Sequence, residues 1–179
     1  EINTIDDLKQ LLPEKVTILG NIPLLKESSE FSQLMIHNNP KSILAESMRN
    51  IRTNLSFVNS SARVIAISSS ISGEGKTFVA LNLAGIIALS GKKTIVIDLD
   101  LRKPKVHLGL NVPNDKGISN LIIKQATLDE CIRTSEIETL DFISAGPIPP
   151  NPSELILSES FFEILEELKS RYDLVIIDN

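Results

Sequence analysis

The stretch RVIAISSSISGEGKTFVALNLAGIIALSG, residues 63–91, predicts a strand, a loop and a helix in direct succession. An apolar, β-branched run over 64–67 ends in a turn rich in serine and glycine, and helix-forming residues then continue until Gly91 provides a stop. Gly73 and Gly75 allow the loop backbone to turn its N–H groups inward, and the first N–H groups of a helix have no partner within the helix. The loop is therefore expected to form a pocket suited to an anion.

Lys76 and Thr77 complete a phosphate-binding loop of the Walker A type. In such a loop the lysine ammonium lies beside the β- and γ-phosphates, and the hydroxyl ligates Mg²⁺. Ser70 stands where the motif usually has its first glycine, so only the second half follows the usual pattern. A glycine turn followed by a surface lysine is the alternative interpretation. The residues predicted to bind nucleotide are Ser72, Gly73, Glu74, Gly75, Lys76, Thr77 and Phe78.

A second strand is predicted at 92–98, and acidic residues stand at its carboxyl end. Its continuous apolar core is typical of a sheet covered on both faces. Asp98 and Asp100 belong to the sequence DLDLR at 98–102, and open α/β sheets place their ligands at such strand ends. Two carboxylates near a bound triphosphate can position Mg²⁺ and accept a proton from an attacking hydroxyl. An acidic turn at a strand end is the alternative.

Composition and length suit one α/β domain. With 179 residues the chain can bury about 70% of its unfolded surface, and its net charge of −5 argues against non-specific binding of nucleic acid. The longest apolar stretch, 79–89, is too short to span a bilayer. The single Cys131 allows no internal disulfide and is expected to be buried. Since the sequence opens on Glu1 and stops at Asn179 directly after an apolar strand, we expect it to be an excerpt of a longer protein.

The region before the phosphate loop is predicted to contain a short helix at 4–11, a strand at 16–22, a mobile loop over 23–40 and a helix at 41–58. In the last of these, an apolar stripe with steps of four and three is expected to face the core. Three charged residues lie off the stripe or at its border, where spacing alone favours a solvated face with weak i,i+3 pairs. The stripe is Leu44, Met48, Ile51, Leu55 and Val58, and the charged residues are Glu46, Arg49 and Arg52.

After the second strand we expect a short helix at 117–124, a buried strand at 140–145, a helix at 160–170 and a final strand at 174–177 that Asp178 closes. The turn at 146–154 is explained structurally, because Asn151 can cap the following helix and Pro152 suits its first position. The 160–170 helix carries a core stripe of Phe161, Ile164, Leu165 and Leu168.

Three motifs together resemble the bacterial tyrosine kinases of capsule and exopolysaccharide export. They are SSSISGEGKT at 68–77, DLDLR at 98–102 after an apolar strand, and Glu46-x-x-Arg49-x-x-Arg52 on the predicted helix. Supporting stretches are LGNIP at 19–23, RTNLSF at 52–57 and AGPIPPNPSEL at 145–155. The resemblance thus covers nearly the whole sequence.

This resemblance implies a P-loop NTPase-type α/β fold of the deviant Walker A class, with a mostly parallel sheet, helices on both faces, and ATP and Mg²⁺ as cofactors. It assigns Lys76, Asp98 and Asp100 to catalysis. Thr77, Asp100 and Asp178 would hold the metal, the last of them through water at the end of the strand LVIID. From the sequence alone, Asp178 could also be a strand-end turn residue.

The resemblance also implies partners. In the family, Glu46, Arg49 and Arg52 help subunits assemble into a ring in which one chain phosphorylates tyrosines of its neighbour. A membrane-spanning polysaccharide co-polymerase segment, fused or separate, would activate the domain at the inner face of the cell membrane, and a cognate tyrosine phosphatase would act on it. We expect a single kinase domain over 1–179, with an N-terminal strand, loop and oligomerisation helix at 1–60 and a nucleotide-binding core at 63–179.

Two departures from the family pattern matter. Ser72 stands where the family usually has proline, and the only tyrosine is Tyr172, which is expected to be structural. The family's acceptor tyrosines cluster in a tail that would lie beyond Asn179. Two alternatives remain open: a switch ATPase of the plasmid-partitioning and septum-placement class, and a nucleotide-gated scaffold without phosphotransfer. The first class carries a signature lysine where this chain has Ile71, which argues against it.

Overall fold

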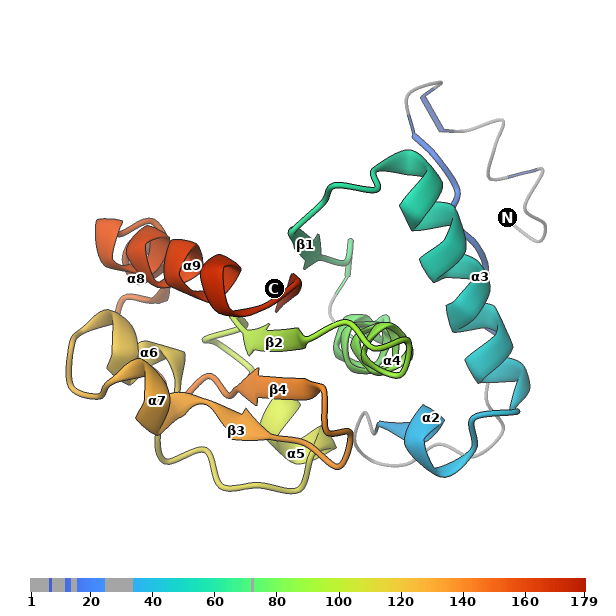
Figure 1. The fold of residues 1–179 in the computed structure, drawn as a ribbon. Helices are drawn as coiled ribbons and strands as arrows, with labels where there is room; N and C mark the ends of the chain where they lie inside the picture. Colours follow the sequence, from blue (N-terminus) through green and yellow to red (C-terminus); the bar gives the residue numbers. More distant parts are fainter. Residues whose placement is uncertain (1–6, 8–11, 14–15, 25–33, 72) are drawn as a thin grey trace.

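The computed structural model describes residues 7, 12–13, 16–24, 34–71 and 73–179. Within them, one sheet has the strand order β1-β5-β2-β4-β3 (Figure 1). Its strands are β1 (Val64–Ile67), β2 (Thr94–Asp98), β3 (Arg133–Thr134), β4 (Leu140–Ile143) and β5 (Leu174–Asp178). All neighbouring pairs are parallel except β3 with β4. The mostly parallel sheet is confirmed, and the short antiparallel β3 is an addition to the prediction.

The register of the sheet brings the predicted site residues together. β5 lies between β1 and β2, and Asp178 at its end pairs with Ile67 of β1 on one side and with Asp98 of β2 on the other. The carboxyl ends of parallel strands meet at one edge of a sheet, so both acids lie where the phosphate loop leaves β1.

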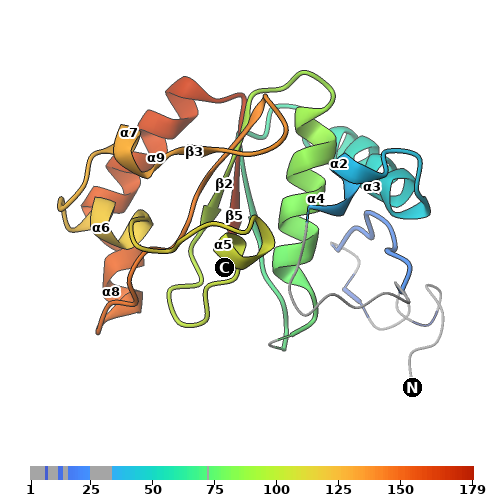
Figure 2. The ribbon, with the colours of Figure 1, turned by 90° about the horizontal axis from the view of Figure 1, so that it is seen from below.

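Alternate residues of the central strands face two separate hydrophobic cores. Val96, Phe142 and Ile176 pack toward α3 (Ile43–Val58) and α4 (Lys76–Ala88). Ile97, Ile143 and Val175 pack toward the other layer, and Figure 2 shows the two layers on opposite sides of the sheet. That second layer contains α6 (Ile118–Ile122), α7 (Leu128–Cys131) and α9 (Glu159–Arg171). Helices on both faces are thus confirmed.

The α4 helix is apolar on every side because it lies between the sheet and α3. Its residues from Ala80 to Ala88 are all buried. The buried Asn82 on this helix has a structural task, since its Oδ1 accepts hydrogen bonds from the N–H groups of Met35 (2.9 Å) and Ile36 (3.2 Å). These contacts hold the start of α2 (Met35–Asn38), so the predicted loop over 23–40 is wrong where this helix forms.

Other predictions for the N-terminal region also need correction. Residues 16–22 form no strand; the segment lies against α3, where the Asn54 amide donates to the Leu19 carbonyl at 2.8 Å. The helix at 41–58 is confirmed as α3, but its stripe does not stay buried, because Val58 is 57% exposed at the end that extends past the sheet. The predicted helix at 4–11 lies, apart from Asp7, outside the described residues.

The remaining helices are α5 (Val106–Gly109) and α8 (Pro152–Ile156). Pro152 occupies the first turn of α8 as predicted, but Asn151 does not cap it: its amide donates to the Glu154 carboxylate at 2.7 Å instead. Cys131 is buried as expected. No helix in the described part of the chain is long and apolar enough to cross a membrane.

Candidate active site

The loop between β1 and α4 takes a conformation that its glycines make available. Gly73 and Gly75 have φ values of +97° and +91°, a region that residues with a Cβ rarely adopt. Gly75 directly precedes α4, and its carbonyl accepts the N–H of Val79 at 2.9 Å. Ser72 lies outside the described residues.

The Glu74 side chain closes the first half of this loop. Its Oε2 accepts hydrogen bonds from the backbone N–H groups of Ser70 (2.9 Å) and Ile71 (3.1 Å). The sequence analysis placed Glu74 among the nucleotide-binding residues for its position in the motif and assigned nothing to its carboxylate. The contact explains how a loop without the usual first glycine keeps a defined turn.

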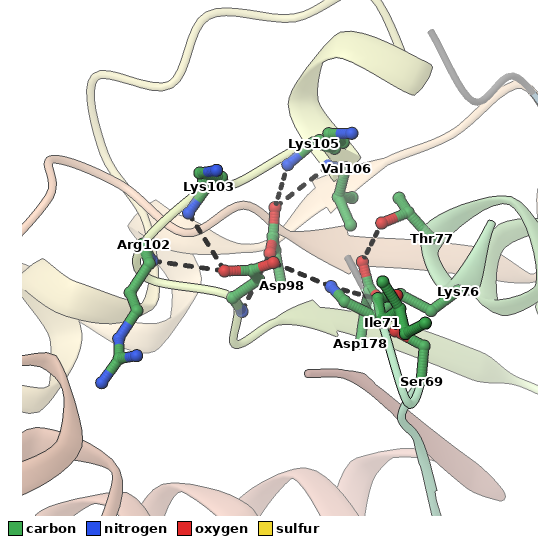
Figure 3. A network of polar contacts seen from close by, with 11 residues as sticks. Ser69, Ile71, Lys76, Thr77, Asp98, Arg102, Lys103, Lys105, Val106 and Asp178 are labelled. Atoms are coloured by element: carbon green, nitrogen blue, oxygen red, sulfur yellow. Dashed lines mark hydrogen bonds and ion pairs between the residues drawn. The ribbon is translucent and has the colours of Figure 1, made fainter. Parts of the chain in front are cut away.

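Lys76 and Thr77 contact two acids, Asp100 in the turn after β2 and Asp178 at the end of β5 (Figure 3). Lys76 Nζ lies 2.8 Å from Asp100 Oδ2 and 3.6 Å from Asp178 Oδ1. The Thr77 hydroxyl donates to Asp178 Oδ2 at 2.6 Å. Four residues that the sequence predicted from three separate motifs therefore form one cluster. The side chain of Phe78, by contrast, packs against the hydrophobic core.

Asp98 is fully buried, and its oxygens are engaged by the backbone that follows it. Oδ1 accepts the N–H of Asp100 (3.2 Å), and Oδ2 accepts those of Lys105 (3.2 Å) and Val106 (3.0 Å). Asp98 therefore shapes the turn that leads from β2 into α5. The catalytic role predicted for it stays a prediction.

Asp100, two residues after Asp98, also accepts hydrogen bonds from the backbone that follows it, and in addition contacts the phosphate loop. Its Oδ1 accepts the N–H groups of Arg102 (3.3 Å) and Lys103 (3.0 Å), while Oδ2 contacts Lys76. Asp100 is thus the link between the DLDLR segment and α4. The Arg102 guanidinium extends the connection to Ser153 at the start of α8, with an Nη2 to Oγ distance of 3.4 Å.

The ionisation of the cluster follows from burial and from its charges. Burial raises the pKa of Asp98 to about 7, with the charges of Asp178 and Asp100 adding to the effect. Burial also raises the pKa of Asp178, which the Thr77 hydrogen bond and the Lys76 charge offset only in part. For Asp100, burial is outweighed by the Lys76 hydrogen bond and by the Lys103 N–H, so its pKa is lowered.

The donors in this cluster fit Mg²⁺. Carboxylate and hydroxyl oxygens are its preferred ligands, and Asp178 Oδ1 is a buried oxygen without a hydrogen-bond partner among the described residues. In the same part of the chain no three acidic, histidine or cysteine side chains could hold a metal by themselves. A magnesium ion here would therefore need phosphate oxygens and water to complete its coordination.

Glu46, Arg49 and Arg52 lie on α3, apart from this cluster. Glu46 and Arg49 form the predicted i,i+3 ion pair at 2.8 Å, and Arg49 also donates to the Pro40 carbonyl. Arg52 is half-buried rather than fully available at the surface, because its Nη1 donates to the Ile86 carbonyl at 3.2 Å. This contact satisfies a carbonyl in the last turn of α4.

Known proteins match most of this chain in sequence. A family model described as an AAA domain matches residues 62–179. CapB of Staphylococcus aureus, whose name is "putative tyrosine-protein kinase CapB", is 41% identical over 157 residues, 87% of this chain and 69% of CapB. The tyrosine-protein kinase Wzc of Salmonella typhi is 39% identical over 149 residues, 82% of this chain. The chain spans only 21% of the length of Wzc.

Solved structures separate the alternatives. The kinase domain of Escherichia coli tyrosine kinase ETK matches with a TM-score of 0.89 at 28% identity, covering 99% of this chain and 73% of that one. The septum-site protein MinD from Pyrococcus horikoshii, complexed with Mg-ADP, reaches a TM-score of 0.56 at 26% identity and covers 65% of this chain and 48% of that one. The ETK kinase domain therefore matches about a third more of this chain than MinD does.

Proposed function

The chain belongs to the bacterial tyrosine kinase family of capsule and exopolysaccharide systems, and on that premise we propose that it transfers the γ-phosphoryl group of ATP to tyrosines of neighbouring subunits. The observation that carries the proposal is the cluster in which Lys76 Nζ lies 2.8 Å from Asp100 and the Thr77 hydroxyl lies 2.6 Å from Asp178. It joins a phosphate loop to Asp178 at the end of β5 and to Asp100 in the turn after β2, and this supports phosphoryl transfer by positioning and charge neutralisation.

In the proposed reaction the phenolic oxygen of a tyrosine forms a bond to the γ-phosphorus, its proton is released, and ADP is the leaving group. Lys76 binds the β- and γ-phosphate oxygens, for which it must leave its present contacts with the two acids. Thr77, Asp100 and Asp178 would hold Mg²⁺, and the ion would supply charge neutralisation at the phosphates. The contribution of the protein is then mostly positioning and charge neutralisation.

A switch ATPase is the second candidate, because it would use the same loop to hydrolyse ATP. The contact between Lys76 and Asp100 does not distinguish the two reactions. The kinase is favoured because ETK matches 99% of this chain at a TM-score of 0.89, and MinD 65% at 0.56. The kinase is also favoured because this chain has Ile71 where the switch ATPases carry their signature lysine.

We further propose that Glu46, Arg49 and Arg52 contribute to a ring-like assembly in which the transfer occurs between subunits. Glu46 is exposed and Arg49 half-buried on α3, while the half-buried Arg52 also donates to the Ile86 carbonyl of α4. The assembly would work at the inner face of the cell membrane beside a membrane-spanning activator, fused or separate. Wzc is about five times as long as the segment that matches, since the chain covers 21% of it. This length is consistent with an activator fused to the kinase domain.

The experiment is to incubate the longest natural form of the protein with ATP labelled at the γ-phosphate and with Mg²⁺. The label should appear on tyrosine in the protein. Free labelled phosphate as the only product would instead establish the switch ATPase, and bound nucleotide without turnover would establish the scaffold. Omitting Mg²⁺ should abolish transfer.

A further inference from the structure

A small cavity of about 80 Å³ lies between the phosphate loop and the turn that follows β2. One side is formed by Gly73, Gly75, Lys76 and Thr77, and the other by Asp100, Lys103 and Lys105. The lining thus contains three lysines and one aspartate. Such a balance of charge suits an anion that carries more than one negative charge.

The backbone at both added lysines is held in place by acids. Asp100 Oδ1 accepts the N–H of Lys103 at 3.0 Å, and the buried Asp98 accepts that of Lys105 at 3.2 Å. Figure 3 shows both contacts beside the cluster of Lys76 and Thr77. The turn therefore fixes where the two side chains start, although both lysines are exposed.

Neither ammonium group has a counter-ion among the residues that the structure describes. Within the described part of the chain, Lys103 and Lys105 make contacts through their backbone N–H groups, and neither side chain makes an ion pair or hydrogen bond. Lys76, in contrast, already has Asp100 and Asp178 as partners. Two cations without counter-ions beside a phosphate loop are available to a ligand.

We propose that Lys103 and Lys105 bind the γ-phosphate of ATP from the side opposite the phosphate loop. The γ end is favoured because the backbone N–H of Lys103 and the ammonium of Lys76 contact the two oxygens of one carboxylate, that of Asp100, so that the Lys103 side chain begins close to the lysine of the phosphate loop. In phosphoryl transfer, charge develops on the oxygens of the transferred group, and a cation supplied within the same chain stabilises it. The two lysines thereby distinguish ATP from ADP. This inference rests on the proposed nucleotide site but not on the identity of the phosphate acceptor.

The test is to measure the affinities of ATP and ADP, each with Mg²⁺, by titration calorimetry for Lys103→Ala and Lys105→Ala. Each variant should lose about tenfold in ATP affinity relative to ADP affinity, since a charge-assisted contact to the γ-phosphate is removed. Lys103→Arg should retain the preference for ATP. Lys92→Ala is the matched control, because Lys92 is an exposed lysine at the opposite end of β2.

An unchanged ratio of ATP to ADP affinity in both alanine variants would overturn the inference. If that ratio is unchanged while the KM for an acidic protein substrate rises, the lysines bind the acceptor and not the nucleotide. The outcome is separable from the proposed function: a fallen ratio in a protein that never phosphorylates tyrosine would uphold the inference and refute the kinase. Normal tyrosine phosphorylation with an unchanged ratio of ATP to ADP affinity would refute the inference and uphold the kinase.

Discussion

Replacing Asp178 by asparagine should separate the stability of the fold from the binding of magnesium. Asp178 is fully buried, with Oδ2 bonded to the Thr77 hydroxyl and Oδ1 3.6 Å from Lys76 Nζ. The asparagine keeps an oxygen that can accept from Thr77, and Lys76 keeps Asp100 as its partner. Because no charge is left unpaired, we expect the free energy of unfolding without ligand to change by less than about 1 kcal/mol.

The effect on ligand binding should be much larger. At 100 times its dissociation constant, Mg-ATP stabilises the wild-type fold by about 2.7 kcal/mol, which is about 5–10 °C in Tm for a domain of this length. Loss of a carboxylate that holds the metal through water weakens metal affinity by about 10–100-fold. If the affinity falls 100-fold, the same concentration of Mg-ATP stabilises the Asp178→Asn variant by only about 0.4 kcal/mol, or about 1 °C in Tm.

Thermal unfolding with and without Mg-ATP measures both quantities. Asp129→Asn is the control, since the Asp129 side chain is 80% exposed and pairs with Arg171 far from the phosphate loop. A full ligand-induced shift in Asp178→Asn would show that Asp178 does not hold the metal. A loss of more than about 2 kcal/mol without ligand would show that the negative charge is needed by the fold itself.

Two further predictions concern residues outside the cluster. Arg49→Ala should shift the particle toward monomers in sizing experiments with an unchanged Tm. Arg52→Ala should cause the same shift toward monomers and also lower the free energy of unfolding by about 1 kcal/mol, because its hydrogen bond to the Ile86 carbonyl is lost. If the oligomer is unchanged in both variants, these residues only form a solvated face. Tyr172→Phe should lower the free energy of unfolding by about 1–2 kcal/mol and leave phosphotransfer intact, because the Tyr172 hydroxyl is bonded to Asp141 at 2.6 Å; phosphate mapped to Tyr172 would contradict this.

The low accessibility of Tyr172 supports the last prediction. The residue is 4% exposed, and burial together with the Asp141 hydrogen bond raises the pKa of its phenol. Lys93 Nζ lies 4.9 Å from the centre of its ring and covers one face. The sequence analysis expected a structural role for this tyrosine, and the contacts confirm it.

The core of the fold could be predicted because its signals are local. The apolar run at 64–67, the glycines of the loop and the acids of DLDLR each specify a short piece of backbone, and parallel pairing then gathers the strand ends. Asp178 was assigned to the site only through the family resemblance, and the structure brings it within hydrogen-bond distance of Thr77. Its strand ends at the same edge as β1 and β2.

What could not be predicted depends on contacts distant in the sequence. The segment at 16–22 has the composition of a strand but packs against α3 and not against a sheet edge. The α2 helix forms because Asn82, 47 positions after Met35, accepts hydrogen bonds from the first N–H groups of the helix. The sequence placed Asp98 and Asp100 at the carboxyl end of a strand but could not show that backbone N–H groups occupy the Asp98 carboxylate. The pair Lys103 and Lys105 carried a visible signal, two lysines directly after DLDLR, that the motif search did not use.

The most direct test of the central claim is to mix wild-type protein with a tagged Lys76→Met variant, both in the longest natural form, in the presence of ATP and Mg²⁺. The variant alone should carry no phosphotyrosine while still unfolding cooperatively, with a lowered Tm because Asp100 and the buried Asp178 lose their common counter-ion. In the mixture, the tagged variant should become phosphorylated on tyrosine by its active neighbours. Phosphotyrosine on Lys76→Met incubated alone, or none on it beside an active wild type, would contradict the account.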